Sequence, residues 1–125
     1  MNILVDSSVW IEHFRHNNEE LKQIIMQNRI FVHPFVLGEL ACGSMKNRSE
    51  TLHFLQNLPV PIQPSNEEVL DFIDREKLHG KGISFVDVHI LISSILTGCV
   101  LWTFDKKLLL VQKKLKIQSI HGVKN

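Results

Sequence analysis

The sequence contains only two cysteines, and they form neither a CxxC pair nor a cysteine-rich framework. This absence excludes a disulfide scaffold as the basis of the fold. Cys42 and Cys99 each lie in an apolar stretch, so we expect both to be buried free thiols in a reducing compartment. Because 125 residues can bury a core without disulfides or a structural metal, we expect residues 1–125 to form a single domain.

The chain also lacks a long hydrophobic run that is free of polar groups. The apolar segment 83–104 contains Asp87 and His89 and is divided by Gly98, which indicates a buried helix followed by a buried strand rather than a membrane span. No signal-peptide pattern follows Met1. With 44% hydrophobic and 22% charged residues and no repeats, the sequence is typical of a globular protein, which we expect to be cytoplasmic and without membrane contact.

Acidic residues are missing from the end of the chain. Residues 106–125 carry six basic and no acidic side chains, whereas residues 1–105 carry eight basic and 13 acidic ones, and the net charge is +1. A lysine-rich edge can contact the phosphates of a polyanion such as RNA. A solvated helix face produces the same pattern and, taken alone, explains it better. The lysines are Lys106, Lys107, Lys113, Lys114, Lys116 and Lys124.

Strand-like and helix-like segments alternate along the sequence, which predicts an α/β fold with a mostly parallel sheet. Strands are predicted at residues 3–6, 30–32, 99–103 and 117–120. In the first half, helices are predicted from a cap at Ser7 or Ser8 to residue 14, at 19–27, from Pro34 to an end at Gly43, and at 48–58. In the second half, one helix follows a cap at Ser65 or Asn66 and another covers 105–113. Between them, a helix runs from Ser84 to Gly98 and starts with a capping box formed by Ser84 and Asp87.

Four carboxylates stand alone at the edges of apolar segments: Asp6, Glu39, Asp87 and Asp105. Burying an unpaired charge is expensive, so acidic groups rarely enter such segments without a partner. Asp6 and Asp105 follow predicted strands, and ligands of parallel α/β sheets collect beyond the carboxyl ends of strands. Oxygen ligands suit Mg²⁺, which can activate water for attack on a phosphodiester. The four acids together therefore suggest a divalent-metal site.

Each aspartate also has a purely structural explanation. An acid in the first turn of a helix is favoured by the helix dipole, and this suffices for Asp6, Asp87 or Asp105 taken singly. Glu39 is different, because no such role explains a glutamate in the middle of an apolar helix. Zinc is disfavoured, since His13 and His16 lie on a solvent-facing helix end and no cysteine joins them.

Taken in order, these segments resemble one family, the PIN-domain ribonucleases, and within it the VapC toxins of bacterial toxin–antitoxin pairs. The resemblance covers nearly the whole chain. It is strongest over residues 3–11, where an apolar strand is followed by Asp6, two serines and an apolar helix. Residues 36–40, 84–87 and 101–105 also match the family pattern, each around one of the remaining acids.

The resemblance implies a PIN-like three-layer sandwich with helices flanking a mostly parallel central sheet. It implies an endoribonuclease toxin that acts on RNA, is neutralised by a small antitoxin protein and forms a homodimer. Two departures from the family pattern are the Ser7-Ser8 pair and His89, and neither removes a ligand. The implied ligands of Mg²⁺ or Mn²⁺ are Asp6, Glu39, Asp87 and Asp105, with Ser8 and Thr103 as supporting polar groups.

Two other functions are compatible with parts of the sequence. A non-catalytic PIN-like module could use the acids to hold a structural metal or could serve a protein partner. A receiver-type phosphoacceptor domain would require a second acid beside Asp6, which is absent. Trp10 and Trp102 could stack bases and His89 could contact RNA, but their apolar surroundings favour core packing. The Gly80-Lys81-Gly82 segment lacks Walker spacing and is interpreted as a loop.

Overall fold

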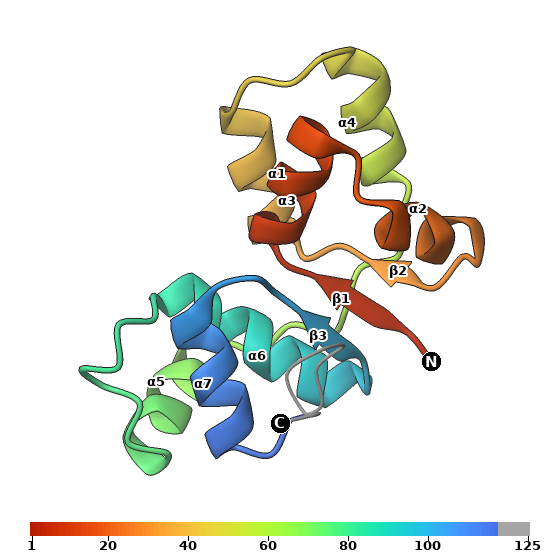
Figure 1. Cartoon of the computed structure of the whole chain (residues 1–125). Coiled ribbons are helices and arrows are strands. Elements are labelled where there is room, and N and C mark those ends of the chain that lie inside the picture. Colours follow the sequence, from red (N-terminus) through yellow and green to blue (C-terminus); the bar gives the residue numbers. More distant parts are fainter. Residues whose placement is uncertain (118–125) are drawn as a thin grey trace.

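The structure is a computed structural model that describes residues 1–117. The described helices and strands follow the predicted order, with two helices between β1 and β2 and four between β2 and β3, and the helices flank the sheet on both sides (Figure 1). In chain order the elements are β1 (Ile3–Val5), α1 (Ser7–His16), α2 (Glu19–Met26), β2 (Ile30–Phe31), α3 (Pro34–Cys42), α4 (Arg48–Gln56), α5 (Asn66–Arg75), α6 (Phe85–Thr97), β3 (Val100–Trp102) and α7 (Lys106–Lys114).

The sheet of residues 1–117 has three strands in the order β2-β1-β3, and both pairs are parallel. Ile3 pairs with Ile30 on one side and with Val100 on the other, and Val5 pairs with Trp102. Helices α1 to α4 gather on the side of β2, and helices α5 to α7 gather on the side of β3 (Figure 1). The α/β class with a parallel central sheet is therefore confirmed.

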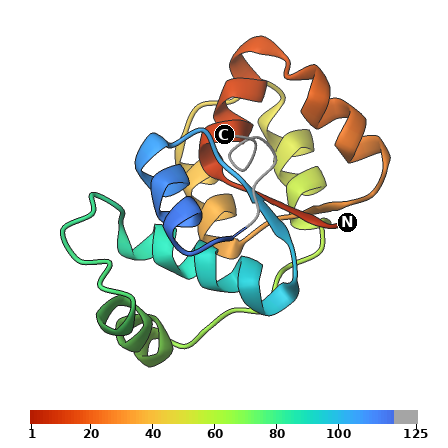
Figure 2. The same cartoon turned by 60° about the horizontal axis from the view of Figure 1, so that its bottom comes forward.

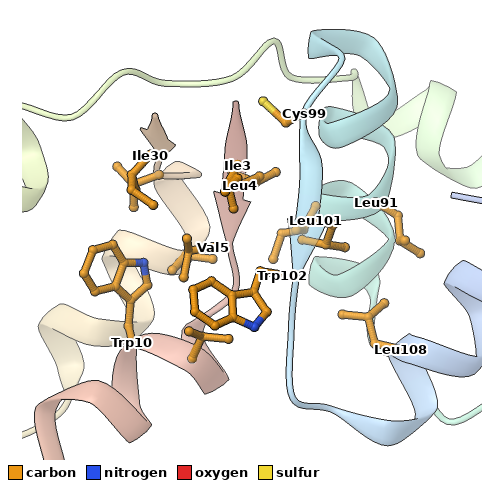
Figure 3. Close-up of a cluster of buried hydrophobic side chains, with 14 of the residues drawn as sticks. Ile3, Leu4, Val5, Trp10, Ile30, Leu91, Cys99, Leu101, Trp102 and Leu108 are labelled. Atoms are coloured by element: carbon orange, nitrogen blue, oxygen red, sulfur yellow. The ribbon is translucent and has the colours of Figure 1, made fainter. Parts of the chain in front are cut away.

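The core surrounds the central strand β1, whose three residues are all buried. Aliphatic side chains from the sheet pack with Trp10 of α1, Leu91 of α6 and Leu108 of α7 (Figure 3). Trp10 and Trp102 are each only 1% exposed, which confirms their core role and leaves neither ring available for a base. Burial of large aromatic side chains contributes strongly to the hydrophobic stabilisation of a small domain.

Local sequence signals explain where the helices begin. The side chains of Ser65 and Ser84 each accept a hydrogen bond from the third helical residue, and Glu68 and Asp87 return it, so α5 and α6 both start with a capping box. Helix α3 starts at Pro34 and is followed by Gly43, as predicted.

Three predictions need correction or fall outside the structure. Neither Ser7 nor Ser8 caps α1: the N-cap is Asp6, because the strand ends one residue earlier than predicted and both serines are already helical. Cys42 is exposed at the end of α3, so only Cys99 is a buried thiol. The strand predicted at 117–120 lies outside the described residues, except for its first position.

Among residues 1–117, no helix combines the length and apolar character needed to cross a membrane. The apolar segment 83–104 instead forms α6 and β3, as predicted.

Candidate metal centre

Two of the four acids lie where adjacent parallel strands end. Asp6 follows β1 directly and is the N-cap of α1, while Asp105 is the N-cap of α7, three residues beyond β3. The backbone N–H of Asp6 donates to the carbonyl of Trp102 at 2.9 Å, which ties the end of β1 to the end of β3. The chain therefore leaves both strands at the same end of the sheet, toward α1 and α7 (Figure 2).

Asp6 is held by two hydroxyl groups. Its side chain is 5% exposed, and its Oδ2 accepts hydrogen bonds from Ser8 Oγ at 2.8 Å and from Thr103 Oγ1 at 2.7 Å. Each hydroxyl has one proton and uses it on Asp6, so their mutual 3.2 Å contact carries no hydrogen bond. Within residues 1–117, Oδ1 of Asp6 has no hydrogen-bond partner, and this oxygen is free to bind a ligand.

Asp87 and Asp105 repeat this pattern. Oδ2 of Asp87 accepts from the backbone N–H of Ser84 at 2.9 Å, and Oδ1 of Asp105 accepts from the N–H groups of Lys107 and Leu108. In the described part of the chain, the second oxygen of each carboxylate makes no hydrogen bond. All three aspartates thus use one oxygen to fix their orientation and keep the other available.

The Ser8 and Thr103 hydroxyls also organise the loop that carries Asp105. Thr103 Oγ1 accepts from the N–H of Asp105 at 3.0 Å, and Ser8 Oγ accepts from the N–H of Phe104 at 3.0 Å. Thr103 is 3% exposed, so its hydrogen bonds are shielded from water. The two side chains therefore connect Asp6 to Asp105 through a single network.

Glu39 lies exposed on α3, which packs against α1. Partial burial of its carboxylate raises its pKa, and the charges of Asp6 and Asp87 raise it further, whereas a contact with the Ser7 hydroxyl opposes the shift. The sequence predicted Ser7 only as a possible helix cap and not as a site residue. A hydroxyl residue one position after a strand-ending aspartate is the signal that could have identified it.

The pKa of Asp87 is also raised above its ordinary value. Burial of this half-buried carboxylate is the largest cause, its hydrogen bonds with Ser84 oppose the shift, and the charges of Asp6 and Asp105 add to it. Electrostatic interactions therefore link Asp87 to both strand-end aspartates and Glu39 to Asp6 and Asp87. These interactions link the acids in pairs: Glu39 with Asp6, Glu39 with Asp87, Asp87 with Asp6, and Asp87 with Asp105.

Within residues 1–117, no three histidine, cysteine, aspartate or glutamate side chains lie close enough to form a metal cage by themselves. Mg²⁺ does not require such a cage, because it keeps several waters and is held directly by one or two carboxylates. Three aspartates with one free oxygen each fit this coordination, and hard oxygen donors do not suit a soft metal.

Other polar residues considered in the sequence analysis have structural roles outside the proposed metal centre. His89 is 3% exposed in the core, and its Nε2 makes a 3.1 Å hydrogen bond with Asn66 Oδ1. Nδ1 of His13 accepts from the backbone N–H of Asn18, so this histidine belongs to the helix end rather than to a zinc site. Gly80 and Gly82 lie in a loop and have positive φ angles.

A groove of about 660 Å³ opens beside Glu39, between the end of α1, helix α3 and the following loop. The groove is lined by both apolar and cationic side chains. The lining residues are Ile11, Phe14, Arg15, His16, Glu39, Leu40, Gly43, Ser44, Met45 and Lys46.

Comparison with known proteins identifies the family pattern independently. The family model described as PIN domain matches residues 3–114. Ribonuclease VapC32 from two strains of Mycobacterium tuberculosis (CDC 1551 / Oshkosh and ATCC 25618 / H37Rv) is 41% identical over 107 residues, which cover 85% of this chain and 86% of the relative.

Two solved structures share the fold at lower sequence identity. The crystal structure of PAE2754 from Pyrobaculum aerophilum has a TM-score of 0.63 and 21% identity, covering 88% of this chain and 84% of the other. The crystal structure of FitAcB from Neisseria gonorrhoeae has a TM-score of 0.65 and 17% identity, covering 98% and 99%. At these identities, the similarity concerns the fold alone.

Proposed function

This chain belongs to the PIN-domain family and is a VapC-type ribonuclease by homology, and we propose that four acids form its metal centre. The observation that carries this proposal is common to the three aspartates. Each accepts hydrogen bonds on one carboxylate oxygen, and its other oxygen accepts none from the described residues. The proposed ligands of Mg²⁺ or Mn²⁺ are Asp6, Asp87 and Asp105, with Glu39 either as a ligand or as the base that orients water.

Side chains of this protein would position the metal ion and the attacking water for hydrolysis of RNA phosphodiester bonds. A bound divalent ion supplies activated water for in-line attack and stabilises the leaving oxygen. Asp6 takes the central ligand role because Thr103 and Ser8 fix it in a buried position. Glu39 is suited to hold a proton from the attacking water, since its raised pKa brings it closer to neutral pH.

Cleavage of total cellular RNA tests this proposal. Purified protein, shown to be folded and free of inhibitor, is incubated with Mg²⁺, Mn²⁺ or EDTA beside Asp6→Asn. Asparagine can still accept the hydrogen bonds from Ser8 and Thr103, so the variant should fold but lose the charge that binds metal. We expect discrete, metal-dependent fragments from the wild-type protein only. An Asp6→Asn protein that cleaves RNA in a metal-dependent manner would refute the assignment.

We also propose that the partner is a small antitoxin whose chain covers the groove beside Glu39. Apolar Phe14, Leu40 and Met45 can take an apolar segment of such a partner, and Arg15 and Lys46 can pair with its acidic residues. Met45→Asp should abolish neutralisation by the product of a neighbouring small open reading frame while leaving RNA cleavage intact. Unchanged neutralisation would exclude this groove.

A homodimer formed through helices of the first half of the chain is a further part of the proposal. Ile11 of α1 and Met26 of α2 are exposed apolar side chains on these helices, which supports it. Size-exclusion chromatography at micromolar concentration should give the dimer mass. Elution as a monomer would contradict this part without affecting the nuclease.

A further inference from the structure

Four phenylalanines are exposed, and three of them adjoin the proposed metal centre. Phe35, Phe85 and Phe104 are 39%, 40% and 42% exposed, and Phe54 on α4 is 40% exposed away from it. A single exposed apolar side chain needs no explanation. An explanation is needed for three exposed phenyl rings that each lie within four residues of a different proposed ligand.

The first two rings come from the helices that carry Glu39 and Asp87. Phe35 precedes Glu39 by four residues on α3, so the two side chains share a helix face one turn apart. Phe85 begins α6 and precedes Asp87 by two residues within the first helical turn. Both phenylalanines therefore lie within about one helical turn of a proposed ligand along the helix, and Phe85 and Asp87 leave α6 on different faces.

A buried histidine holds these two rings in place. The ring centroids of Phe35 and Phe85 each lie 4.9 Å from that of His89, with interplanar angles of 71° and 73°. The Nε2 hydrogen bond to Asn66 of α5 fixes the imidazole in turn. His89 thus contacts both phenyl rings edge-on, His33 adds a second contact to Phe35 at 4.9 Å, and both rings remain partly exposed.

The third ring is anchored just beyond the end of β3. Phe104 packs edge-on against Trp102 at 5.9 Å, and Ser8 Oγ accepts its backbone N–H. Phe104 lies between Thr103, which holds Asp6, and Asp105. Its position is therefore fixed by the same network that orients two of the proposed ligands.

We propose that Phe35, Phe85 and Phe104 form a stacking platform for unpaired bases that flank the scissile phosphate. The proposal rests on the proposed nuclease function and deepens it by naming the side chains that would hold bases on either side of the cut. Rigid exposed aromatic rings beside a phosphate-binding centre are what single-stranded nucleic acids need, because each base has a π-face for stacking. Bases in a duplex are already stacked on one another and cannot use the rings.

RNA binding by protein that cannot cleave tests this proposal. Full-length Asp6→Asn protein is titrated with fluorescent oligoadenylate, alone or paired with oligouridylate, and compared with the same protein carrying Phe35→Ala, Phe85→Ala or Phe54→Ala. We expect each platform change to weaken binding of the single strand about tenfold. Phe54→Ala, with its equally exposed ring, is the matched control and should bind as the parent does. Duplex binding should be weak in every variant.

Phe35→Leu and Phe85→Leu separate stacking from simple apolar contact. Leucine preserves packing against His89 and hence the melting temperature, but it has no π-face, so RNA affinity should fall nearly as far as with alanine. The proposal is overturned if the leucine variants bind oligoadenylate like the parent, or if the alanine variants match Phe54→Ala. It is also overturned if these changes weaken only the binding of a protein antitoxin.

The outcome is independent of whether the chain cleaves RNA. Platform-dependent binding by a protein whose wild-type form is inactive would refute the nuclease and keep the platform. Metal-dependent cleavage that is insensitive to the changes at both Phe35 and Phe85 would keep the nuclease and refute the platform.

Discussion

At the scale of single residues, the proposed site depends on carboxylates that hydrogen bonds hold in a fixed orientation before a metal binds. Each strand-end or helix-start aspartate receives hydrogen bonds on one oxygen only. The donors to Asp87 and Asp105 are backbone N–H groups at helix starts, whereas the donors to Asp6 are two side chains. Substituting Ser8 or Thr103 would therefore remove a donor to the Asp6 carboxylate itself.

Thr103 provides the sharpest test of this orientation. Thr103→Val keeps the shape but removes the hydroxyl, so Asp6 Oδ2 loses a donor and the N–H of Asp105 loses its acceptor. Because these groups are shielded from water, we expect a loss of about 1–3 kcal/mol in unfolding free energy. Mn²⁺ affinity should fall as well.

Thr103→Ser is the control, since it restores the hydroxyl. It should recover Mn²⁺ affinity in a titration followed by electron paramagnetic resonance. Equal Mn²⁺ affinity of the valine and serine variants would show that the hydroxyl does not position Asp6.

Protonation of His33 should make the stability of the folded protein depend on pH. Burial lowers its pKa to about 4, with a smaller contribution from His89, and its Nδ1 accepts from the N–H of Phe35 at the start of α3. The neutral form is therefore favoured in the folded state. Its stabilising contribution is complete above pH 6.5, the ordinary pKa, and is lost as the pH falls to about 4. The full contribution is about 3 kcal/mol.

His33→Asn keeps a capping acceptor but does not titrate. Chemical denaturation between pH 4 and 7 should therefore give a flatter stability profile for the variant than for the wild-type protein. Parallel profiles would mean that His33 keeps an ordinary pKa in the folded chain.

At the scale of elements, α5 and α6 begin with the same capping box but only α6 carries a proposed ligand. Ser84→Ala removes the acceptor of the Asp87 N–H and loosens the first turn of α6. Ser65→Ala does the same to α5. Each change should cost about 1 kcal/mol of stability, measured by denaturant unfolding.

Activity should separate these two variants. Ser84→Ala should lower the rate of RNA cleavage because Asp87 is then less well oriented, whereas Ser65→Ala should cleave RNA like the wild-type protein. A similar loss of cleavage in both variants would trace the effect to stability and not to Asp87.

Sequence signals predicted the elements well where capping and breaking residues are explicit. Pro34 and Gly43 bound α3, and the spacing of Ser84 and Asp87 identified the start of α6. The cap of α1 was misplaced because Asp6, Ser7 and Ser8 are all good capping residues, and only the sheet register decides where the strand ends. The exposure of Cys42 could not be predicted, since it depends on which face of α3 the other helices cover.

The sequence pattern singles out the residues of the proposed site, but it does not predict the hydrogen bonds that hold them. Isolated acids at segment ends mark Asp6, Glu39, Asp87 and Asp105. The contact of Thr103 with Asp6 joins residues 97 positions apart, so it follows from strand pairing and not from local pattern. The exposed phenylalanines were missed because exposure is a property of the folded chain.

At the scale of the whole molecule, the acidic centre should cost stability when no metal is bound. The folded state raises the pKa of Glu39 and Asp87, so their ionised forms at neutral pH are less favourable in the folded chain than in the unfolded one. Their stabilising contribution is present below their ordinary pKa values and is lost as the pH rises through the raised ones. Burial is the largest cause of both shifts, and repulsion from the neighbouring acids adds to it. A bound cation offsets the repulsion.

Glu39→Gln should therefore raise the melting temperature of metal-free protein at pH 7 and lower its metal response. Mg²⁺ should raise the melting temperature of the wild-type protein more than that of the variant. Thermal unfolding with EDTA and with Mg²⁺ measures both effects. A lower melting temperature of Glu39→Gln in EDTA would argue against repulsion at this site.

Equilibrium binding of Mn²⁺ tests the central claim most directly, because it measures the metal centre without RNA, partner or turnover. Electron paramagnetic resonance would follow Mn²⁺ titrated into the wild-type protein and into Asp6→Asn, Asp87→Asn, Asp105→Asn and Glu39→Gln. Saturable binding that weakens about tenfold or more in the aspartate variants, and most in Asp6→Asn, is the predicted result. Binding that is absent, or is unchanged in all four variants, would contradict the assignment of these acids as a metal centre.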